Sequence, residues 1–291
     1  MKDSINKMKM GWLPDYPDFR DYGHERGEVS KLFKQMKISD SSGKKLASKI
    51  DLSSWCSPVE DQGDIGSCTA NAGVGMLEYF ENRAFGTFIN ASRLFLYKVT
   101  RNLLGWAGDT GAFLRSTMGA MALFGVLPEK YWPYITADYD KEPTPFCYSF
   151  SQNYQALIYY RLDTAGTTKP QLLTKIKTNL AAGLPSMFGF KVYSSIQKPV
   201  NPGDIPYPTT GEKVLGGHAI LAIGYDDSKK IKNPTSGAIT TGAIKIRNSW
   251  GTGWGASGYG WLPYDYIIKG LAVDWWTLIK NEWIETKNFG Y

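Results

Sequence analysis

The sequence of 291 residues contains only three cysteines and two histidines. Three cysteines are too few for the disulfide framework of a small secreted domain, so they favour a reducing compartment or a fold that needs no disulfides. Whether Cys56 and Cys147 pair stays open at this stage. No cysteine and histidine cluster has the spacing of zinc ligands, and no glycine loop resembles a phosphate cradle. We therefore expect no metal and no cofactor.

The chain also lacks long apolar runs and blocks of like charge. No stretch of 18 apolar residues occurs, which argues against a membrane-spanning helix, and the first ten residues lack the apolar core of a secretory signal. The net charge of +6 is spread along the sequence, without the basic block of a nucleic-acid reader. We expect a monomer with neither membrane nor nucleic-acid partners. The compartment stays open between the cytoplasm and export by another route.

The order of the predicted elements indicates the fold class. With 43% hydrophobic residues the chain can bury a full core. Patterns with helical spacing come first, and patterns typical of buried strands follow, which predicts an α+β protein with two lobes and a cleft between them. The expected helices cover residues 67–85, 92–102, 115–124 and 169–181, and the last of them would complete the first lobe or cap its junction with the second. The expected strands cover residues 156–162, 185–192, 216–225, 243–251, 259–263 and 276–279.

Three side chains that suit nucleophilic catalysis stand at the edges of these elements. Cys68 follows a glycine-rich loop and begins a predicted buried helix, where free backbone amides and the helix dipole favour a thiolate. The alternative is that Cys68 is a small buried hydrophobe. His218 begins one predicted strand and Asn248 ends another. Together they are the parts of a Cys-His-Asn system.

Four blocks of the sequence resemble, in the same order, the motifs of papain-like cysteine peptidases. They are residues 62–70, 108–111, 218–219 and 248–255. The resemblance implies a papain-like fold, with a helical lobe built on the Cys-bearing helix, an antiparallel sheet or barrel lobe, and the active site in the cleft between them. The chain is similar to the microbial members of the family that have a short N-terminal pro-segment. By this resemblance, residues 1–50 are an N-terminal extension and residues 51–291 are the peptidase domain.

The match has departures. Ile65 and Thr69 replace a cysteine and an aromatic residue that the family usually has. Asn248 lies farther along the chain than the family spacing predicts, because residues 226–237 form a polar, turn-rich insertion. We expect this insertion to be an enlarged hairpin loop that leaves the catalytic geometry unchanged.

The resemblance also assigns catalytic roles. Cys68 would be the nucleophile, and His218 would exchange protons with it and with the leaving amine. Asn248 would orient the imidazole, while Trp250 shields that hydrogen bond from water. Gln62, six residues before the cysteine, would stabilise the oxyanion together with the backbone N–H of Cys68.

Substrate-binding positions follow from the same comparison. Asp109, Thr110 and Gly111 stand where the family pairs its backbone with an extended substrate. Ala219 matches a residue of the pocket for the substrate's P2 side chain, to which the chain around Gly189 and Ile267 would contribute. A bulky apolar P2 residue is therefore expected.

The first 50 residues differ in character from the rest. Residues 11–22 contain two prolines and alternating aromatics and favour an extended segment whose rings pack on a surface. Residues 29–37 fit one short helix, and residues 39–45 fit a flexible linker. One interpretation is a pro-segment that lies in or near the cleft, restrains activity and is processed at the linker. The other is a permanent strap on the mature domain.

The function that this sequence predicts is a cysteine endopeptidase acting on peptides or proteins. Since His24 is the other histidine and lies in the extension, the catalytic domain lacks the histidine-bearing occluding loop of a carboxypeptidase. Two alternatives stay open: a catalytically silent recognition module, and a thiol acyltransferase or deamidase. The intact set of Cys68, His218, Asn248 and Gln62 favours the peptidase.

Overall fold

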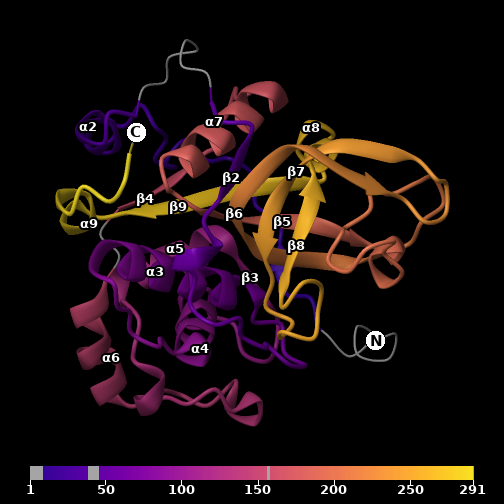
Figure 1. The fold of residues 1–291 in the computed structure, drawn as a ribbon. Coiled ribbons are helices and arrows are strands. Elements are labelled where there is room, and N and C mark those ends of the chain that lie inside the picture. Colours follow the sequence, from indigo (N-terminus) through magenta and orange to yellow (C-terminus); the bar gives the residue numbers. More distant parts are fainter. Residues whose placement is uncertain (1–8, 39–45, 156–157, 291) are drawn as a thin grey trace.

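A central helix, α3 (Cys68–Phe85), lies between a helical layer and an antiparallel sheet (Figure 1). Every residue of α3 from Cys68 to Phe80 is buried, because helices pack on one side of it and the sheet on the other. The helix ends at Gly86, whose φ of 72° lies in the left-handed region that glycine adopts without strain. The computed structural model describes residues 9–38, 46–155 and 158–290.

The helical lobe contains three further helices: α4 (Arg93–Leu103), α5 (Leu114–Leu123) and α6 (Pro145–Ser151). Ser92 caps α4 by accepting a hydrogen bond from the backbone N–H of Phe95. The first three predicted helices are confirmed to within one residue at each end, while α6 was not predicted. The α+β class is confirmed as well.

The second lobe is a seven-stranded sheet in the order β4-β9-β5-β6-β7-β8, with β2 paired to β6. The neighbouring strands of this sheet run antiparallel. The strands are β2 (Lys49–Asp51), β4 (Ile158–Arg161), β5 (Ser186–Tyr193), β6 (Val214–Lys232), β7 (Ile239–Arg247), β8 (Tyr259–Pro263) and β9 (Ala272–Ile279).

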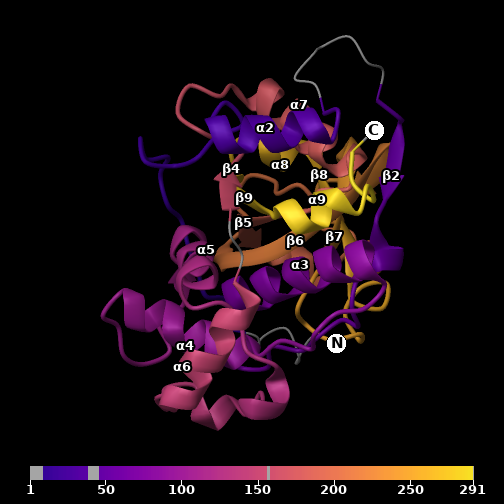
Figure 2. The same ribbon diagram turned by 90° about the vertical axis from the view of Figure 1, so that its left-hand side faces the viewer.

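Helix α7 (Lys169–Ala181) has the predicted bounds but lies neither in the helical lobe nor at the junction of the lobes. It packs on β6 and on α8 (Tyr264–Ile268), so it covers the sheet face opposite α3 (Figure 2). A capping box between Thr168 and Gln171 fixes its start. Helical periodicity gives the apolar stripe of a helix but not the side of the sheet that this stripe covers.

The expected hairpin loop at residues 226–237 is mostly strand, so that prediction was wrong. Strand β6 continues to Lys232, which pairs with Ile239 at the start of β7. The turn between them is closed by the Asn233 side chain, whose Oδ1 accepts hydrogen bonds from the N–H groups of Thr235 and Ser236. The polar composition of these residues predicted a loop. A two-stranded ribbon that is exposed to solvent is also rich in polar residues, so composition does not distinguish it from a loop.

The N-terminal segment crosses both lobes. Strand β1 (Trp12–Leu13) pairs in parallel with β3 (Ala112–Phe113). Helix α2 (Gly27–Gln35) lies near α9 (Asn281–Glu285), on the side of the molecule that faces the viewer in Figure 2. Strand β2 belongs to the main sheet and includes residue 50, the predicted boundary. The predicted linker at residues 39–45 lies outside the described residues.

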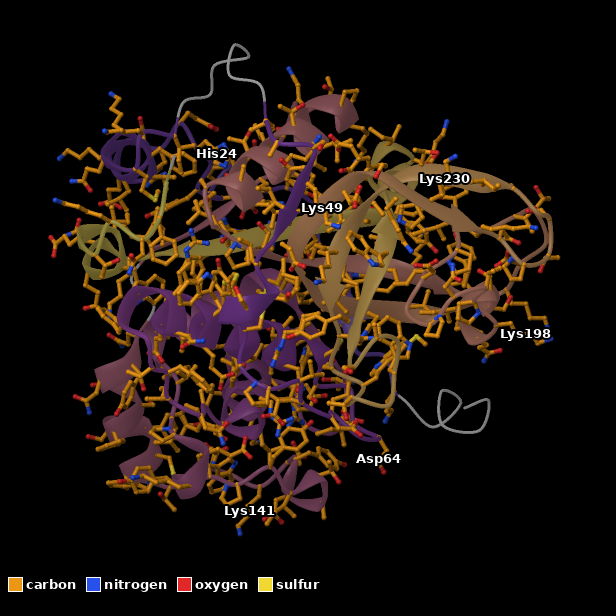
Figure 3. All side chains as sticks on the ribbon, in the orientation of Figure 1. His24, Lys49, Asp64, Lys141, Lys198 and Lys230 are labelled. Atoms are coloured by element: carbon orange, nitrogen blue, oxygen red, sulfur yellow. The ribbon has the colours of Figure 1, made fainter. Side chains whose placement is uncertain are left out.

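Charged side chains are distributed around the surface. Lys49 on β2, Lys141, Lys198 and Lys230 are all exposed and lie at separate places on the molecule (Figure 3). The spread of positive charge along the sequence thus corresponds to a spread in space.

Candidate active site

Cys68 is the first residue of α3 and follows a loop held from two sides. The backbone N–H of Gly66 donates to Asp109 Oδ1 at 2.8 Å, which ties the loop to the helical lobe. The backbone N–H of Gln62 donates to the carbonyl of Ser249 at 2.8 Å, which ties it to the loop after β7. Cys68 is therefore fixed at the junction of the two lobes.

His218 lies on β6 and Asn248 directly follows the neighbouring strand β7, and the two side chains are joined by a hydrogen bond. The distance from His218 Nε2 to Asn248 Oδ1 is 2.8 Å. Because that oxygen also accepts from the backbone N–H of Ser249, it is the acceptor, and His218 Nε2 carries the proton. Trp250 stacks on the imidazole at a ring distance of 4.5 Å and is itself buried. The other ring nitrogen, Nδ1, then has a free lone pair in the neutral histidine.

The Cys68 thiol is fully buried, next to β6. Burial raises its pKa to about 11, and hydrogen bonds from the backbone of Ala219 and Gly11 only partly oppose this shift. Burial likewise lowers the pKa of His218 to about 4, against the opposing hydrogen bond with Asn248. Desolvation thus opposes the thiolate that the helix terminus favours, and the thiolate stays a prediction. Within the described residues His218 Nδ1 has no hydrogen-bond partner, so the imidazole and the Cys68 thiol are not joined by a hydrogen bond.

Residues 9–13 of the N-terminal segment, the cleft segment, cover the thiol. The side-chain amide of Gln62 donates to the carbonyl oxygen of Lys9 at 2.9 Å. The backbone N–H of Ala112 donates to the carbonyl oxygen of Gly11 at 2.8 Å. A Cβ placed on Gly11 would overlap the carbonyl oxygen of Gly66 and lie 2.6 Å from its Cα. Only glycine fits at this contact.

The predicted substrate-binding residues surround the cleft segment. Gly111 has a φ of 75°, and a Cβ there would overlap the carbonyl oxygen of Gly11. The side chain of Asp109 accepts from Gly66 N–H, from Tyr97 Oη–H at 2.5 Å and from Lys9 Nζ at 2.6 Å, so it supports the loop and the cleft segment. Thr110 is exposed, and its hydroxyl donates to the neighbouring carbonyl at 3.1 Å.

Ala219 lies on β6 directly opposite Gly189 of β5. Their Cα–Cβ directions share one sheet face, because residues opposite each other in an antiparallel pair point to the same side. Trp12 lies on this face, since a Cβ on Gly189 would overlap its indole ring. Trp12 is 4% exposed and donates its indole N–H to Asp274 Oδ2 at 3.1 Å.

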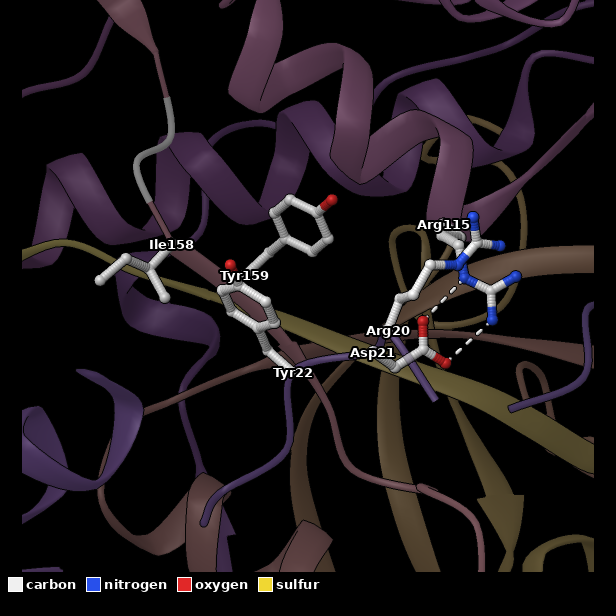
Figure 4. A pocket seen from close by; sticks show the side chains of 6 residues that line it. All are labelled: Arg20, Asp21, Tyr22, Arg115, Ile158 and Tyr159. Atoms are coloured by element: carbon white, nitrogen blue, oxygen red, sulfur yellow. Dashed lines mark hydrogen bonds and ion pairs between the residues drawn. The ribbon is translucent and has the colours of Figure 1, made fainter. Parts of the chain in front are cut away.

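An ionic cluster, the anchor, holds the N-terminal segment beyond the cleft. Asp21 accepts from Arg115 at 2.8 Å and from the fully buried Arg161 at 3.3 Å, and Arg115 also pairs with Asp15. Beside it is a pocket lined by residues 20–22 of the segment and by Arg115, Ile158 and Tyr159 (Figure 4). None of the predicted site residues lines this pocket, so it is separate from the candidate active site.

Sequence reasoning missed three contributors to the site: Trp12, Asp274 and Ser249, whose hydroxyl donates to Gln62 Oε1 at 2.7 Å. Ser249 stands between the predicted Asn248 and Trp250, so its place in the motif was a signal. The isolated Asp274 in an apolar run was the signal for a buried carboxylate with a partner. Nothing in the sequence joined it to Trp12, 262 residues away.

Other features of the described residues bear on cofactors and location. All three cysteines are free, so Cys56 and Cys147 do not pair. Among residues 9–38, 46–155 and 158–290, no three His, Cys, Asp or Glu side chains gather in a way that could hold a metal ion. In the same ranges, no helix combines the length and the apolar character needed to cross a membrane.

Comparisons with known proteins agree with this geometry. The family model described as papain family cysteine protease matches residues 46–270. An uncharacterised peptidase C1-like protein of Acanthamoeba polyphaga mimivirus is 32% identical over 75% of this chain and 68% of its own length. Chicken cathepsin K is 28% identical, and the match spans 70% of this chain and 54% of the cathepsin.

The solved structures include the cysteine protease xylellain from Xylella fastidiosa. It is 33% identical, with a TM-score of 0.74, and the match covers 94% of this chain and 96% of xylellain. The proform of the ragweed pollen cysteine protease Amb a 11 is 21% identical with a TM-score of 0.62 and covers 83% of this chain, which shows the shared fold. The two-lobe papain-like fold is thus confirmed.

Proposed function

This chain belongs to the papain family of cysteine proteases, and on that premise we propose that it is an endopeptidase whose active site its own N-terminal segment blocks. The enzyme class, a thiol protease, follows from the family. The catalytic residues and the restraint are the proposal. The observation that carries it is the hydrogen bond from Gln62 Nε2 to the carbonyl of Lys9, beside a buried Cys68.

The proposed reaction begins when the cleft segment leaves and water reaches the site. Solvation lowers the cost of charge, so the proton of the Cys68 thiol passes to Nδ1 of His218. The thiolate attacks the scissile carbonyl carbon, and the oxyanion is stabilised by the side-chain amide of Gln62 and the backbone N–H of Cys68. The imidazolium donates its proton to the leaving amine as the C–N bond breaks.

Deacylation uses the same groups in reverse. His218 takes a proton from water, the hydroxide oxygen attacks the thioester, and the C–S bond breaks to release the acid and restore Cys68. Asn248 holds the Nε2 proton of His218 throughout, so the ring always presents Nδ1 to the sulfur. Trp250 covers the bond between Asn248 and His218 and keeps water from competing for it.

The restraint has a geometric basis. The carbonyl oxygen of Lys9 accepts a hydrogen bond from the side-chain amide of Gln62, the group that would stabilise the substrate oxyanion. Gly11 lies against the thiol of Cys68. The cleft segment runs parallel to β3, with Trp12 opposite Ala112 and Leu13 opposite Phe113. Whether the segment is later removed, as a pro-segment, or only displaced, as a permanent strap, stays a prediction, as do the boundary at residue 50 and the monomeric state.

The test combines peptidase assays with active-site labelling. Full-length protein, Cys68→Ala and His218→Ala are assayed with dipeptidyl coumarin substrates and with an epoxide thiol inhibitor. We expect slow hydrolysis and slow labelling of Cys68 in the unmodified chain, none in Cys68→Ala, and an increase after limited proteolysis of the N-terminal segment. A chain that stays silent and unlabelled after that proteolysis is instead a recognition module. Transfer of acyl groups to added amines in preference to hydrolysis favours an acyltransferase.

A further inference from the structure

Arg115, the second residue of α5, has two carboxylates of the N-terminal segment as its ion-pair partners. Nε and Nη2 donate to the two oxygens of Asp21 at 2.8 and 2.9 Å, and Nη1 donates to Asp15 (Figure 4). Nη2 also donates to the carbonyl oxygen of Tyr16 at 2.7 Å. Among the residues that the structure describes, every hydrogen bond and ion pair of Arg115 thus goes to the segment. Departure of the segment leaves this guanidinium without a carboxylate.

Arg161, the other arginine of the anchor, keeps two partners when the segment leaves. Its Nε donates to Asp163 Oδ1 at 2.9 Å, and its Nη2 lies 3.4 Å from Asp274 Oδ1. Asp163 follows β4 and Asp274 lies on β9, so both stay with the sheet lobe. The charge of Arg161 is therefore compensated in the open chain, whereas the charge of Arg115 is not. The positive end of the α5 dipole adds to the potential around Arg115.

Departure of the segment also opens the space beside Arg115. The pocket next to the anchor has a volume of about 360 Å³, and residues 20–22 of the segment form half of its lining (Figure 4). The other half, Arg115, Ile158 and Tyr159, belongs to α5 and β4 and stays in place. What remains is a guanidinium beside a partly apolar wall that the segment no longer covers. This surface has room for a carboxylate side chain.

The path of the segment gives the distance of Arg115 from the point of cleavage. Gly11 lies against the thiol of Cys68, and Trp12 lies on the sheet face of Ala219, which the family resemblance gives to the P2 side chain. Asp15 stands three residues farther along, a span of about 10 Å in an extended chain. The N-terminal side of a substrate extends from P2 away from Cys68. Its residue at the same path length is P5.

We propose that Arg115 is a specificity residue of the open enzyme and binds an acidic side chain at P5, three positions N-terminal to P2. The proposal rests on the proposed function, because it assumes that substrates replace the segment. It names the substrates as polypeptides with aspartate or glutamate upstream of the cleaved bond. In the latent chain Asp15 occupies the place of that side chain.

The chemistry sets the sign and the size of the preference. A guanidinium binds a carboxylate through charge-assisted hydrogen bonds, while the amide of asparagine offers one neutral acceptor and lysine is repelled. The Arg115 side chain is 25% exposed even with the segment in place, so water and salt screen the pair. We therefore expect a moderate preference for aspartate over asparagine, about fivefold at low ionic strength.

The test compares substrates that differ at one position. Full-length enzyme is assayed with coumarin pentapeptides that carry aspartate, asparagine or lysine at P5 and are otherwise identical. We expect kcat/KM to be highest for aspartate and lowest for lysine at about 20 mM NaCl, and the differences to shrink at about 500 mM NaCl. The ratios do not depend on the fraction of open enzyme, since all three substrates need the same open state.

Arg115→Gln and Arg115→Glu are the variants that test the residue. The first removes the charge and should bring the ratio of aspartate to asparagine to about one, and the second should reverse the order so that the lysine peptide is cleaved fastest. Arg20→Gln is the matched control. Arg20 lines the same pocket but belongs to the segment and pairs with Asp18, so its loss should leave the ratios unchanged.

The outcomes separate this inference from the proposed function. Equal rates for the three peptides overturn the role of Arg115 and leave the peptidase intact. A preference for aspartate that persists in Arg115→Gln, or disappears in Arg20→Gln, also overturns it. If the Arg115 variants do not fold, the three peptides and the effect of salt in the unmodified chain still decide. No cleavage of any substrate, even after proteolytic removal of the segment, overturns the proposed function and this inference with it.

Discussion

Gly11→Ala should release the active site of the full-length chain without any cleavage. Gly11 has no positive φ, so alanine causes no backbone strain there, and its effect is purely steric. The added Cβ would overlap the carbonyl oxygen of Gly66. That loop cannot retreat easily, because Asp109 holds the N–H of Gly66 at 2.8 Å. The cleft segment must therefore shift outward.

The size of the effect follows from overpacking. Forcing one extra carbon into a well-packed contact costs about 1 to 3 kcal/mol. If this cost falls on the closed state alone, the ratio of open to closed chains rises by about 5- to 150-fold, and activity rises with it until most chains are open. The hydrogen bonds to Lys9 and Gly11 are lost in the same step.

The assay measures initial rates of dipeptidyl coumarin hydrolysis at substrate concentrations below KM, together with the rate at which an epoxide inhibitor labels Cys68. Gly27→Ala is the matched control. It lies on the same N-terminal segment, at the start of α2, and a Cβ there meets nothing within 4 Å. It should leave both rates unchanged. Adding Cys68→Ala to the Gly11→Ala chain should abolish hydrolysis.

One result would refute the reasoning. If Gly11→Ala melts at the wild-type temperature and shows the wild-type rates of hydrolysis and labelling, the cleft segment does not limit access to Cys68. An equal increase in Gly27→Ala would show that the segment responds to any substitution. In either case the contact with Gly66 is not the block.

Three further predictions use other parts of the structure. In the Gly11→Ala background, Gln62→Ala should lower kcat about 100-fold or more with little change in KM, because it removes an oxyanion donor; a change confined to KM would contradict that role. Asp21→Asn should raise full-length activity about tenfold or more at pH 7, since it removes the carboxylate that pairs with Arg115 and Arg161; unchanged latency would mean that the anchor does not hold the segment closed. Glu78→Gln should gain stability relative to its parent as pH rises, because burial raises the pKa of Glu78 to about 7 and its ionisation above that pH costs about 3 kcal/mol. Urea unfolding at pH 5 and pH 8, in the Cys68→Ala background, measures this difference, and a pH-independent difference would contradict it.

The sign of the last prediction follows from proton linkage. Between its ordinary pKa of 4.5 and about 7, Glu78 is protonated in the folded chain and ionised in the unfolded chain. The unfolded state therefore binds fewer protons, and this group makes stability fall as pH rises through that window. Glutamine does not ionise, so the stability of the Glu78→Gln chain lacks this decrease with pH.

The fold was largely predictable because its signals are local. The small and apolar residues after Cys68 predicted α3, and the apolar runs around His218 and Asn248 predicted the middle of the sheet. What failed depended on tertiary contacts. The side of the sheet that α7 covers, and the pairing of residues 226–232 with 239–243, are decided by surfaces far apart in the sequence.

The candidate site, too, was predictable where its signals are local and not where it depends on tertiary contacts. Motif spacing identified Gln62, Cys68, His218 and Asn248, and these residues lie at the junction between the lobes. The state of the thiol could not be predicted from those motifs. A helix terminus favours a thiolate, but burial raises the pKa of the Cys68 thiol, and two of the backbone groups that contact it, at Gly11 and Ala219, lie far from Cys68 in the sequence.

The cleft segment is held at several separate points, so loosening one of them should already raise activity. The Gln62 amide, the Ala112 N–H and Asp274 Oδ2 each hold one group of the segment. Asp274→Asn should therefore loosen Trp12 and raise the basal activity of the full-length chain. A role of Asp274 in folding alone would instead lower the activity and the melting temperature together, so the initial rate of hydrolysis and thermal unfolding of the same sample distinguish the two roles.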